Sequence, residues 1–571
     1  MEFKIWAPKA KKVVLCLNGH EYEMQPQTKG YWVCAKTNLQ EPVLYGFKID
    51  DQGPFPDPKS EFQPDGVHGL SQRWIEKFAW KCEQFDPRPL DEAVIYELHV
   101  GTFTDEGTFK AVENKLDHLV DLGVTHLELL PVAAFPGKHG WGYDGVSLYA
   151  PHRFYGNPDD LKHLVDTCHS KGLAVILDVV YNHLGPDGNY LGLYAPYFSD
   201  RYHTPWGEAV NFDCAHSDEV RRFVIDNALM WLRDFRFDAL RIDAVHAIFD
   251  FSALHILEEL QMEVEKLSSE TGRKFDLIAE SDLNDPRLLH SRENGGYGLA
   301  AQWLDDFHHS LHVMFTGEQQ GYYLDFSGPD DLKKCLKSCY VYAGDYAPSR
   351  KRRHGRSATG LNYERFVVSL QNHDQIGNRG LGERLCHLIG YDHCQIATAL
   401  FLLSPFVPML FQGEEWSATA AFMYFTDHID EKLAQAVREG RQREFPALEG
   451  QIPDPQSENT FNRSKLNWGE ISETRHKTML EWHKKLLKIR KKFLNEIRSG
   501  NPDFSVIDSD QRIYRYSTGN ILLFANAGNK DHCLDHPQLQ KAEILLQNKD
   551  IDFAQAGMTL PPGAVILIYQ K

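Results

Sequence analysis

The chain predicts an α/β fold: a (β/α)8 TIM barrel with an N-terminal β-sandwich and a C-terminal β-sheet domain. Three observations support this prediction. Short alternating runs without helical periodicity occupy both ends of the chain, which is typical of sheets with one buried face. Between them, apolar runs alternate with helical patterns, which indicates a parallel sheet. Three of these runs end in an acidic residue, as do barrel strands that carry active-site side chains.

The N-terminal β-sandwich is expected over residues 1–88, as an immunoglobulin-like domain. Alternating runs such as VVLCLN (13–18) and VLYGFKID (43–50) are separated by turn residues there. The segment FDPRPLDE (85–92) contains two prolines and is the expected linker to the barrel. The C-terminal β domain is expected over residues 499–571, where alternation returns.

The barrel is expected over residues 89–498. Its eight strands are expected at 93–100, 125–132, 173–181, 238–245, 275–281, 299–306, 366–374 and 407–415. The connector at 157–172 illustrates the helices between them, because Asn157 is a good N-cap, Pro158 suits the first turn and Gly172 ends the pattern.

Two insertions interrupt the barrel pattern. Residues 182–217 are rich in Gly, Pro, Tyr and Asn and are too long for an ordinary loop, so we expect them over the active-site face. Residues 420–470 are polar and are expected to be irregular. An amphipathic helix is expected next, at 475–495.

Composition excludes several classes of partner. The formal net charge of -19 and the short basic clusters argue against nucleic acid. The chain has no stretch of about 18 apolar residues, so no membrane span is expected. The N-terminus lacks the pattern of a secretory signal. The ten cysteines include no CxxC pair, and Cys335 and Cys339 have no partner pair, so we expect reduced thiols, no metal and a cytoplasmic location.

The three acidic residues are Asp243 in FDALRIDAVH, Glu280 in FDLIAES and Asp374 in FVVSLQNHDQIGN. Cleavage of a glycosidic bond needs one carboxyl group to protonate the leaving oxygen and another to attack the anomeric carbon. Arg241 lies two residues before Asp243, so both side chains should share one strand face. Burial and a neighbouring carboxylate would raise the pKa of Glu280 toward that of a general acid.

Other readings of these residues stay open at this point. The acidic residues also suit ion pairs that cap strands, and His183 and His246 also suit structural roles. Trp141 and Tyr143 offer flat faces to a sugar, although aromatic residues more often belong to a core. Asp144 suits an arginine or a hydroxyl group. The cluster DDFHHSLH (305–312) has metal-like letters, but substrate hydroxyls are the favoured partners in a strand-to-loop context.

Taken in order, DVVYNH, ALRIDAVH, IAES and LQNHD resemble the four conserved regions of the α-amylase family of retaining glycosidases and transglycosylases. More narrowly, the chain resembles the malto-oligosyltrehalose trehalohydrolases. Stretches that carry this closer likeness include YELHVGTFT (96–104), PGKHGWGYDGV (136–146), AESDLNDPRL (279–288) and WLDDFHHSLH (303–312).

The resemblance implies roles for individual residues. Asp243 matches the nucleophile, Glu280 the general acid/base and Asp374 the transition-state stabiliser. The positions expected to bind substrate are Tyr143, Asp144, His183, Arg241, His246, Asp305, His308, His309, His373, Gln375 and Asn378. No cofactor and no bound metal are expected.

The implied reaction is hydrolysis of the α-1,4 bond next to the terminal trehalose of maltooligosyl trehalose, with retention, in trehalose biosynthesis. The implied pathway companion is the synthase that makes this substrate. Two alternatives stay open: a 1,4-α-glucan branching-type transferase, which shares the sandwich, the barrel and the WGYD motif, and a noncatalytic glucan-binding protein. The three acidic residues argue against the second.

Overall fold

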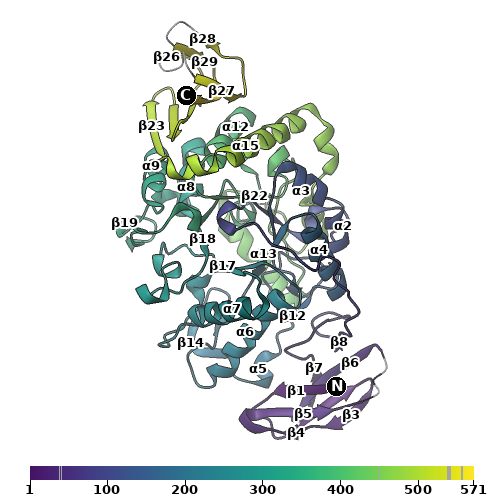
Figure 1. Cartoon of the computed structure of the whole chain (residues 1–571). Helices are drawn as coiled ribbons and strands as arrows, with labels where there is room; N and C mark the ends of the chain where they lie inside the picture. The colour runs from purple at the N-terminus through teal and green to yellow at the C-terminus, as the bar shows by residue number, and fades with distance from the viewer. Residues whose placement is uncertain (38, 40, 449, 536–541, 554–556, 571) are drawn as a thin grey trace.

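The computed structural model describes residues 1–37, 39, 41–448, 450–535, 542–553 and 557–570. The barrel occupies the middle of the molecule, with the N-terminal strands (purple) at one end and the C-terminal strands (yellow) at the other (Figure 1). The predicted fold class is confirmed: a closed barrel with sheet domains at both ends of the chain. The limits predicted for the three domains stay predictions, and parts of 499–571 lie outside the described residues.

Eight parallel strands close the barrel, in the order β10-β13-β16-β17-β18-β21-β22-β9. All eight lie within the expected runs. Their bounds are β9 Ile95–Leu98, β10 His126–Leu129, β13 Ala174–Val179, β16 Ala239–Ile242, β17 Asp276–Ala279, β18 Ala301–Trp303, β21 Phe366–Ser369 and β22 Val407–Phe411.

The strands are shorter than the apolar runs that predicted them, and the differences matter at their C-terminal ends. Asp243 and Glu280 come directly after β16 and β17, where the chain turns out of the sheet. Asp374 and Asp305 were expected at the ends of strands. They lie instead in the first turns of the helices α10 (His373–Gly377) and α8 (Asp305–Thr316). The expected strand-to-loop context of 305–312 was therefore wrong.

Helices surround the barrel. The predicted connector is α4 (Pro158–Ser170), where Asn157 and Asp160 form a reciprocal capping box. The predicted amphipathic helix is α15 (Thr474–Ser499). The other barrel helices are α1 Val100–Phe103, α2 Phe109–Glu113, α3 Leu116–Leu122, α6 Ser217–Arg233, α7 Ile256–Thr271, α9 Pro329–Ser338, α11 Leu385–Ile389 and α12 Tyr391–Leu402.

The two insertions are structured. The first contains α5 (Leu191–Tyr194) and the hairpin of β14 (Phe198–Thr204) and β15 (Gly207–Val210). The second was expected to be irregular, and this was wrong: it contains α13 (Glu431–Glu444) and α14 (Glu458–Arg463). Only Ala434 is buried in α13, so this helix has no apolar stripe for sequence reasoning to detect.

Small antiparallel sheets complete the chain. The N-terminal sheets contain β1 Glu2–Trp6, β2 Val13–Leu17, β3 His20–Glu23, β4 Gln25–Pro26, β5 Tyr31–Ala35, β6 Val43–Ile49, β7 Gln52–Phe55 and β8 Ser71–Arg73. The C-terminal sheets contain β23 Asp503–Asp508, β24 Ile513–Thr518, β25 Ile521–Asn526, β26 His532–Asp535, β27 Ala542–Gln547, β28 Asp552–Phe553, β29 Gly557–Leu560 and β30 Val565–Gln570. Two further pairs flank the barrel: β11 Ala133–Ala134 with β12 Ser147–Pro151, and β19 Asp345–Ala347 with β20 Arg352–His354.

Within the described residues, no helix is long and apolar enough to cross a membrane.

Candidate active site

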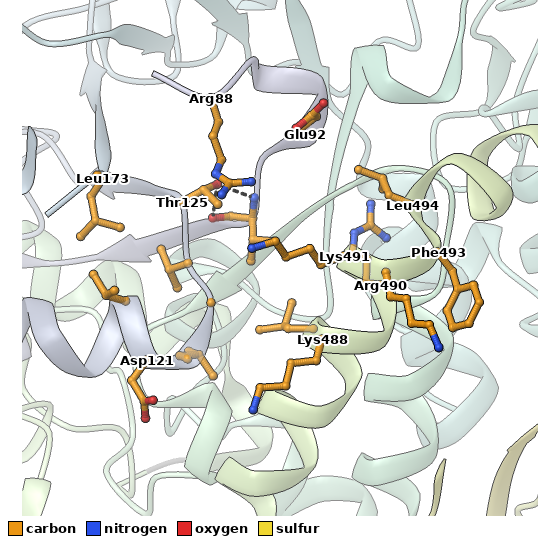
Figure 2. A pocket seen from close by; sticks show the side chains of 18 of the residues that line it. Arg88, Glu92, Asp121, Thr125, Leu173, Lys488, Arg490, Lys491, Phe493 and Leu494 are labelled. Atoms are coloured by element: carbon orange, nitrogen blue, oxygen red, sulfur yellow. Dashed lines mark hydrogen bonds between the residues drawn. The ribbon is translucent and has the colours of Figure 1, made fainter. Parts of the chain in front are cut away.

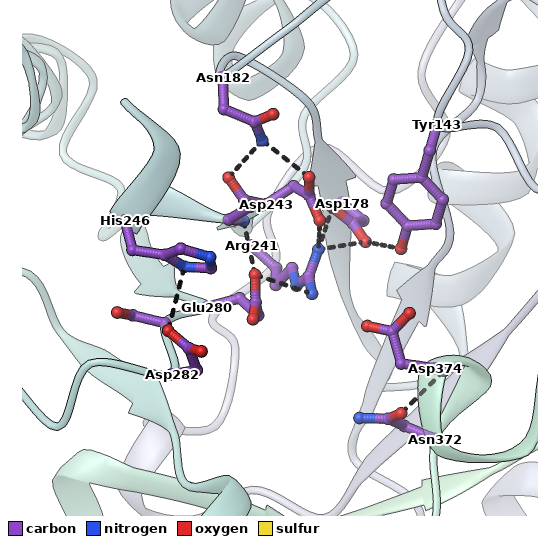
Figure 3. Close-up of polar contacts among 12 residues, drawn as sticks. Tyr143, Asp178, Asn182, Arg241, Asp243, His246, Glu280, Asp282, Asn372 and Asp374 are labelled. Atoms are coloured by element: carbon purple, nitrogen blue, oxygen red, sulfur yellow. Dashed lines mark hydrogen bonds and ion pairs between the residues drawn. The ribbon is translucent and has the colours of Figure 1, made fainter. Parts of the chain in front are cut away.

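The acidic residues predicted from the sequence meet at the C-terminal end of the barrel. Parallel pairing of β16 with β17 places Asp243 and Glu280 on neighbouring strands, each directly after its strand. Asp374 reaches the same end from α10, which follows β21. Figure 3 shows Asp243 and Glu280 on either side of Arg241, with Asp374 facing them across the opening. This is the end at which barrel enzymes carry their active sites.

Arg241 is the centre of the charge network. Its buried guanidinium donates from Nη1 to both carboxylate oxygens of Asp178, at 3.0 and 2.9 Å, and to Oδ1 of Asp243 at 2.8 Å. Nη2 lies 3.8 Å from Oε2 of Glu280. Burial opposes the charge, but the surrounding acidic groups raise the pKa of Arg241 well above its ordinary value. The cation therefore persists and holds Asp243 in place.

Asp243 is fixed on a second side by Asn182. The Asn182 amide donates to Oδ2 of Asp243 at 2.8 Å and to its backbone oxygen at 2.9 Å. The side chain of Asp243 is 12% exposed, so it still opens toward the site. A carboxylate that is held by an arginine and an amide and faces an opening is suited to attack an electrophilic carbon.

Glu280 has the environment of a proton donor. Its Oε2 accepts from the Ala244 N–H at 2.6 Å. Burial raises the pKa of Glu280 well above its ordinary value; nearby Arg241 opposes this shift and Asp243 adds to it. The predicted direction of the shift is confirmed. The raised pKa favours the protonated form of Glu280, which a general acid needs.

Asp374 is the most open of the three, with a side chain that is 44% exposed. Asn372 caps α10 by accepting from the Asp374 N–H at 2.9 Å, and the Asn378 amide donates to Oδ1 of Asp374 at 3.3 Å. Gln375 was expected to bind substrate, but its Oε1 accepts from the Asn372 N–H at 3.0 Å and completes the capping box. The side-chain oxygen of Gln375 therefore already has a hydrogen-bond partner within the protein.

His373 and Tyr143 lie face to face beside Asp374. Their rings stack at 5.1 Å, and the Tyr143 hydroxyl lies 2.8 Å from Nε2 of His373 and donates to Oδ2 of Asp178 at 2.6 Å. His373 is buried, which lowers its pKa, but Asp374 and Glu97 outweigh burial and raise the pKa to about 9.

His183 is covered by the first insertion. Trp206, between β14 and β15, stacks on the His183 ring at 4.7 Å and is 48% exposed. The ring nitrogens of His183 contact Oδ1 of Asn182 and, at 3.0 Å, the backbone oxygen of Tyr143. The hairpin therefore places an aromatic face at the edge of the site.

His246 and Asp144 each lie near an ionisable side chain, at a longer distance than a hydrogen bond. Nδ1 of His246 lies 3.9 Å from Oδ1 of Asp282, and Oδ2 of Asp144 lies 3.9 Å from Nε2 of His428. Burial raises the pKa of Asp144.

The α8 histidines differ from one another. His308 was expected to bind substrate, but it is buried, Nδ1 lies 2.6 Å from the Leu370 oxygen and Nε2 lies 3.0 Å from the Tyr323 hydroxyl. Both ring nitrogens of His308 therefore have hydrogen-bond partners within the protein, and His308 supports the fold around α8. Two other residues of α8, Asp305 and His309, line a neighbouring pocket instead.

That pocket adjoins Asp282 and is lined by Asp305 and His309, together with Tyr322, Phe326 and Arg350. Nδ1 of His309 is buried and has no hydrogen-bond partner among the described residues. Burial lowers the pKa of His309 to about 3, so the ring is neutral. Burial and Asp374 raise the pKa of Asp305 to about 7. The pocket therefore combines a neutral histidine with carboxyl and guanidinium groups, and these donors and acceptors suit sugar hydroxyls.

Sequence reasoning missed Glu97 and Asp178, which are buried in the middle of barrel strands. Each bonds a residue that had been predicted: Glu97 contacts His373, and Asp178 contacts Arg241. The available signal was an acidic residue inside a buried apolar run (YEL, ILDV), since such a charge requires a partner.

A cavity of about 790 Å³ lies at the other end of the barrel, beside the N-terminal residues of β9 and β10. Figure 2 shows Arg88, Thr125, Lys488 and Lys491 among the residues around it. The three acidic residues of the site lie at the opposite strand ends, so this cavity does not belong to the site. Among the residues that the structure describes, no group of three or more His, Cys, Asp or Glu is arranged to hold a metal ion.

Comparison with known proteins assigns the family. The α-amylase catalytic domain model matches residues 71–193. A malto-oligosyltrehalose trehalohydrolase from Saccharolobus solfataricus is 49% identical over 86% of this chain and 85% of its own length. The chain belongs to the malto-oligosyltrehalose trehalohydrolase family. The predicted resemblance is thereby confirmed, within the wider α-amylase family.

Two further matches place this result. A crystal structure described as a putative α-amylase from Salmonella typhimurium covers 100% of this chain and 97% of its own, with 37% identity and a TM-score of 0.90. A 1,4-α-glucan branching enzyme from Geobacillus stearothermophilus is 31% identical, but over only 53% of this chain and 52% of its own length. The likeness to the trehalohydrolase is therefore higher and covers much more of the chain.

Proposed function

We propose that this chain is a glycoside hydrolase that cleaves the α-1,4 bond next to the terminal trehalose of maltooligosyl trehalose. The products are trehalose and a maltooligosaccharide, which makes the reaction a step of trehalose biosynthesis. The observation that carries the proposal is the pairing of a carboxylate held by Arg241 with a buried carboxyl group of raised pKa directly after the next strand, in a chain of this family.

In the first step, Glu280 gives its proton to the glycosidic oxygen as the bond from that oxygen to the anomeric carbon breaks, and trehalose leaves. Oδ of Asp243 attacks the same carbon and forms a covalent glycosyl ester. The Asp374 carboxylate supports the developing positive charge, and the His373 cation lies beside the ring hydroxyls. Arg241 stays charged and disfavours protonation of Asp243.

In the second step, Glu280 has become a carboxylate and takes a proton from water. The water oxygen attacks the anomeric carbon, and the bond to Asp243 breaks. Two inversions give net retention. Arg241 stabilises the carboxylate of Glu280 when it forms, because its Nη2 lies 3.8 Å from Oε2.

The residues proposed to contact the sugar at the cleavage point are Tyr143, Asp144, His183, Arg241, His246 and His373. The pocket lined by Asp305 and His309 is proposed to bind the trehalose end of the substrate. The buried Nδ1 of His309 lies there and lacks a hydrogen-bond partner within the described residues. A site built to bond hydroxyl groups rejects analogues that leave such atoms unpaired. Asn378 is proposed to position the Asp374 carboxylate through the hydrogen bond from its side-chain amide.

A cytoplasmic location and a pathway companion, the synthase that makes maltooligosyl trehalose, are part of the proposal. The support for the location is that all ten cysteines are free, which fits a reducing compartment.

Chromatography of the products separates this function from its rival. Purified protein is incubated with maltooligosyl trehalose and, separately, with linear α-glucan. Release of trehalose from the first is the expected result. New α-1,6 branches in the second, without trehalose from the first, would instead identify a branching-type transferase.

A further inference from the structure

The strand β9 carries one acidic residue to which neither the roles implied by the family resemblance nor the proposed mechanism gives a part. Glu97 lies in the middle of β9 and is completely buried. Its Oε1 is 2.5 Å from Nδ1 of His373, and its Oε2 accepts from the His373 backbone N–H at 3.1 Å. One carboxylate therefore holds both the ring and the backbone of the same histidine.

The hydrogen bonds beyond His373 decide where its protons lie. Asp178 is bonded through both oxygens to Arg241, so it accepts the Tyr143 hydroxyl proton. The Tyr143 oxygen must then accept from Nε2 of His373, at 2.8 Å. Nδ1 faces the Glu97 carboxylate, which only accepts. Both ring nitrogens of His373 therefore carry a proton.

The resulting chain of contacts is continuous and ends at the proposed nucleophile. It runs from Glu97 through His373 and Tyr143 to Asp178, and from there through Arg241 to Asp243. Its residues come from strands β9, β13 and β16, the loop before β12, and α10. Loss of the Glu97 charge would reverse the direction of the Tyr143 hydroxyl. The hydrogen bonds that lead to Asp243 would change with it.

We propose that Glu97 is a positioning residue of the reaction, which holds His373 as a cation against the bound sugar and directs the Tyr143 proton toward Asp178. This inference rests on the proposed function for the placement of the sugar. The same logic operates in carboxylate–histidine pairs at metal sites, where the second partner fixes tautomer and ring orientation.

Several charged and titratable groups besides Glu97 face His373. They are His99, Glu128, Tyr143, Asp178, Arg241 and Asp374. Asp374 and Glu97 raise the pKa of His373, whereas burial and Arg241 lower it. Loss of Glu97 would leave Asp374 as the remaining strong support of the cation.

Glu128 supplies a matched control. It pairs in register with Glu97 on the adjacent strand β10 and is also buried, but neither of its carboxyl oxygens has a hydrogen-bond partner among the residues described. Burial raises its pKa well above the ordinary value, and Glu97 and Asp178 add to the shift. Glu128→Gln therefore changes a buried side chain whose raised pKa favours the neutral form, and it breaks no hydrogen bond among the described residues.

The first test needs no substrate, and the protein that is titrated is the wild type. In wild-type protein with nitrogen-15-labelled histidine, the His373 ring is identified by its loss in His373→Gln and titrated by NMR. We expect two protonated ring nitrogens at pH 7 and a midpoint near the pKa of about 9. A neutral His373 ring at pH 7 would overturn the inference, whatever substrate the enzyme prefers.

The second test compares Glu97→Gln, Glu97→Asp and Glu128→Gln. In Glu97→Gln the midpoint of His373 should fall by about 1–3 pH units, and kcat should fall by about 10–100-fold with a smaller change in KM. Glu97→Asp keeps the charge, so it should keep the raised midpoint and restore part of kcat. Glu128→Gln should leave both unchanged. A folded Glu97→Gln protein with the wild-type midpoint and kcat, or equal losses in Glu128→Gln, would contradict the inference.

Discussion

Replacement of Glu280 by Gln tests the proposed division of labour between the two carboxyl groups. Gln keeps the size of the side chain and an oxygen that accepts from the Ala244 N–H, which lies 2.6 Å from Oε2 in the wild type. The buried pocket therefore keeps its contacts, and the protein should fold. The variant cannot give a proton to the leaving oxygen, because an amide is not an acid at neutral pH.

The magnitude follows from the role and from the environment of Glu280. Burial raises the pKa of Glu280 and favours its protonated form, so the wild-type enzyme has a general acid in place. Such proton transfer contributes about 100- to 10,000-fold, which equals about 2.7–5.4 kcal/mol at 1.36 kcal/mol for each factor of ten. Glycosylation of maltooligosyl trehalose should slow by that factor. An aryl maltooligoside has a good leaving group and needs little protonation, so its glycosylation should slow much less.

The assay is single-turnover kinetics on both substrates, with wild-type protein and Glu280→Gln side by side. A matched control is Glu128→Gln, which also replaces a buried carboxyl group of raised pKa but lies within the barrel strand β10. Equal slowing of both substrates in Glu280→Gln would refute the assignment of Glu280 as the acid, because the loss would then be independent of the leaving group.

Three further predictions follow from the same site. Asp243→Asn removes the attacking charge, so activity should fall by about 1,000-fold or more while the melting temperature changes little; a rate above about a tenth of wild type would contradict the nucleophile assignment. Retention requires the carboxyl groups of Asp243 and Glu280 to lie about 5–5.5 Å apart and the first product to be the α-anomer, which NMR of fresh product tests; a β-anomer would argue for inversion. His309→Ala and Asp305→Ala should lower the rate and also narrow the preference for maltooligosyl trehalose over plain maltooligosaccharide, whereas an unchanged preference would remove the α8 pocket from the recognition of trehalose.

The sequence predicted the barrel well because its signals are local. Each strand is a short apolar run, and the run ends close to the residue that leaves the sheet, as at Asp243 and Glu280. The direction of the Glu280 pKa shift could also be predicted, since it depends on burial and on one neighbouring carboxylate.

The parts that sequence reasoning missed depend on contacts between distant positions or on exposure. Glu97 and His373 are 276 residues apart, and only closure of the barrel brings β9 beside β22 and α10. His308 and His309 are adjacent in sequence, but α8 turns one toward the protein and the other toward the pocket. The helix α13 has a single buried residue, so it lacks the periodic stripe by which helices are recognised.

The most direct test of the central claim compares two substrates of equal length in the unmutated protein: a maltooligosyl trehalose and the plain maltooligosaccharide. The kcat/KM of each is measured by chromatography of the products. Because a pocket that bonds hydroxyl groups discriminates strongly, kcat/KM should be at least about 100-fold higher for maltooligosyl trehalose, with trehalose as the released product. Comparable values for the two substrates would contradict the account and indicate a general α-glucan hydrolase.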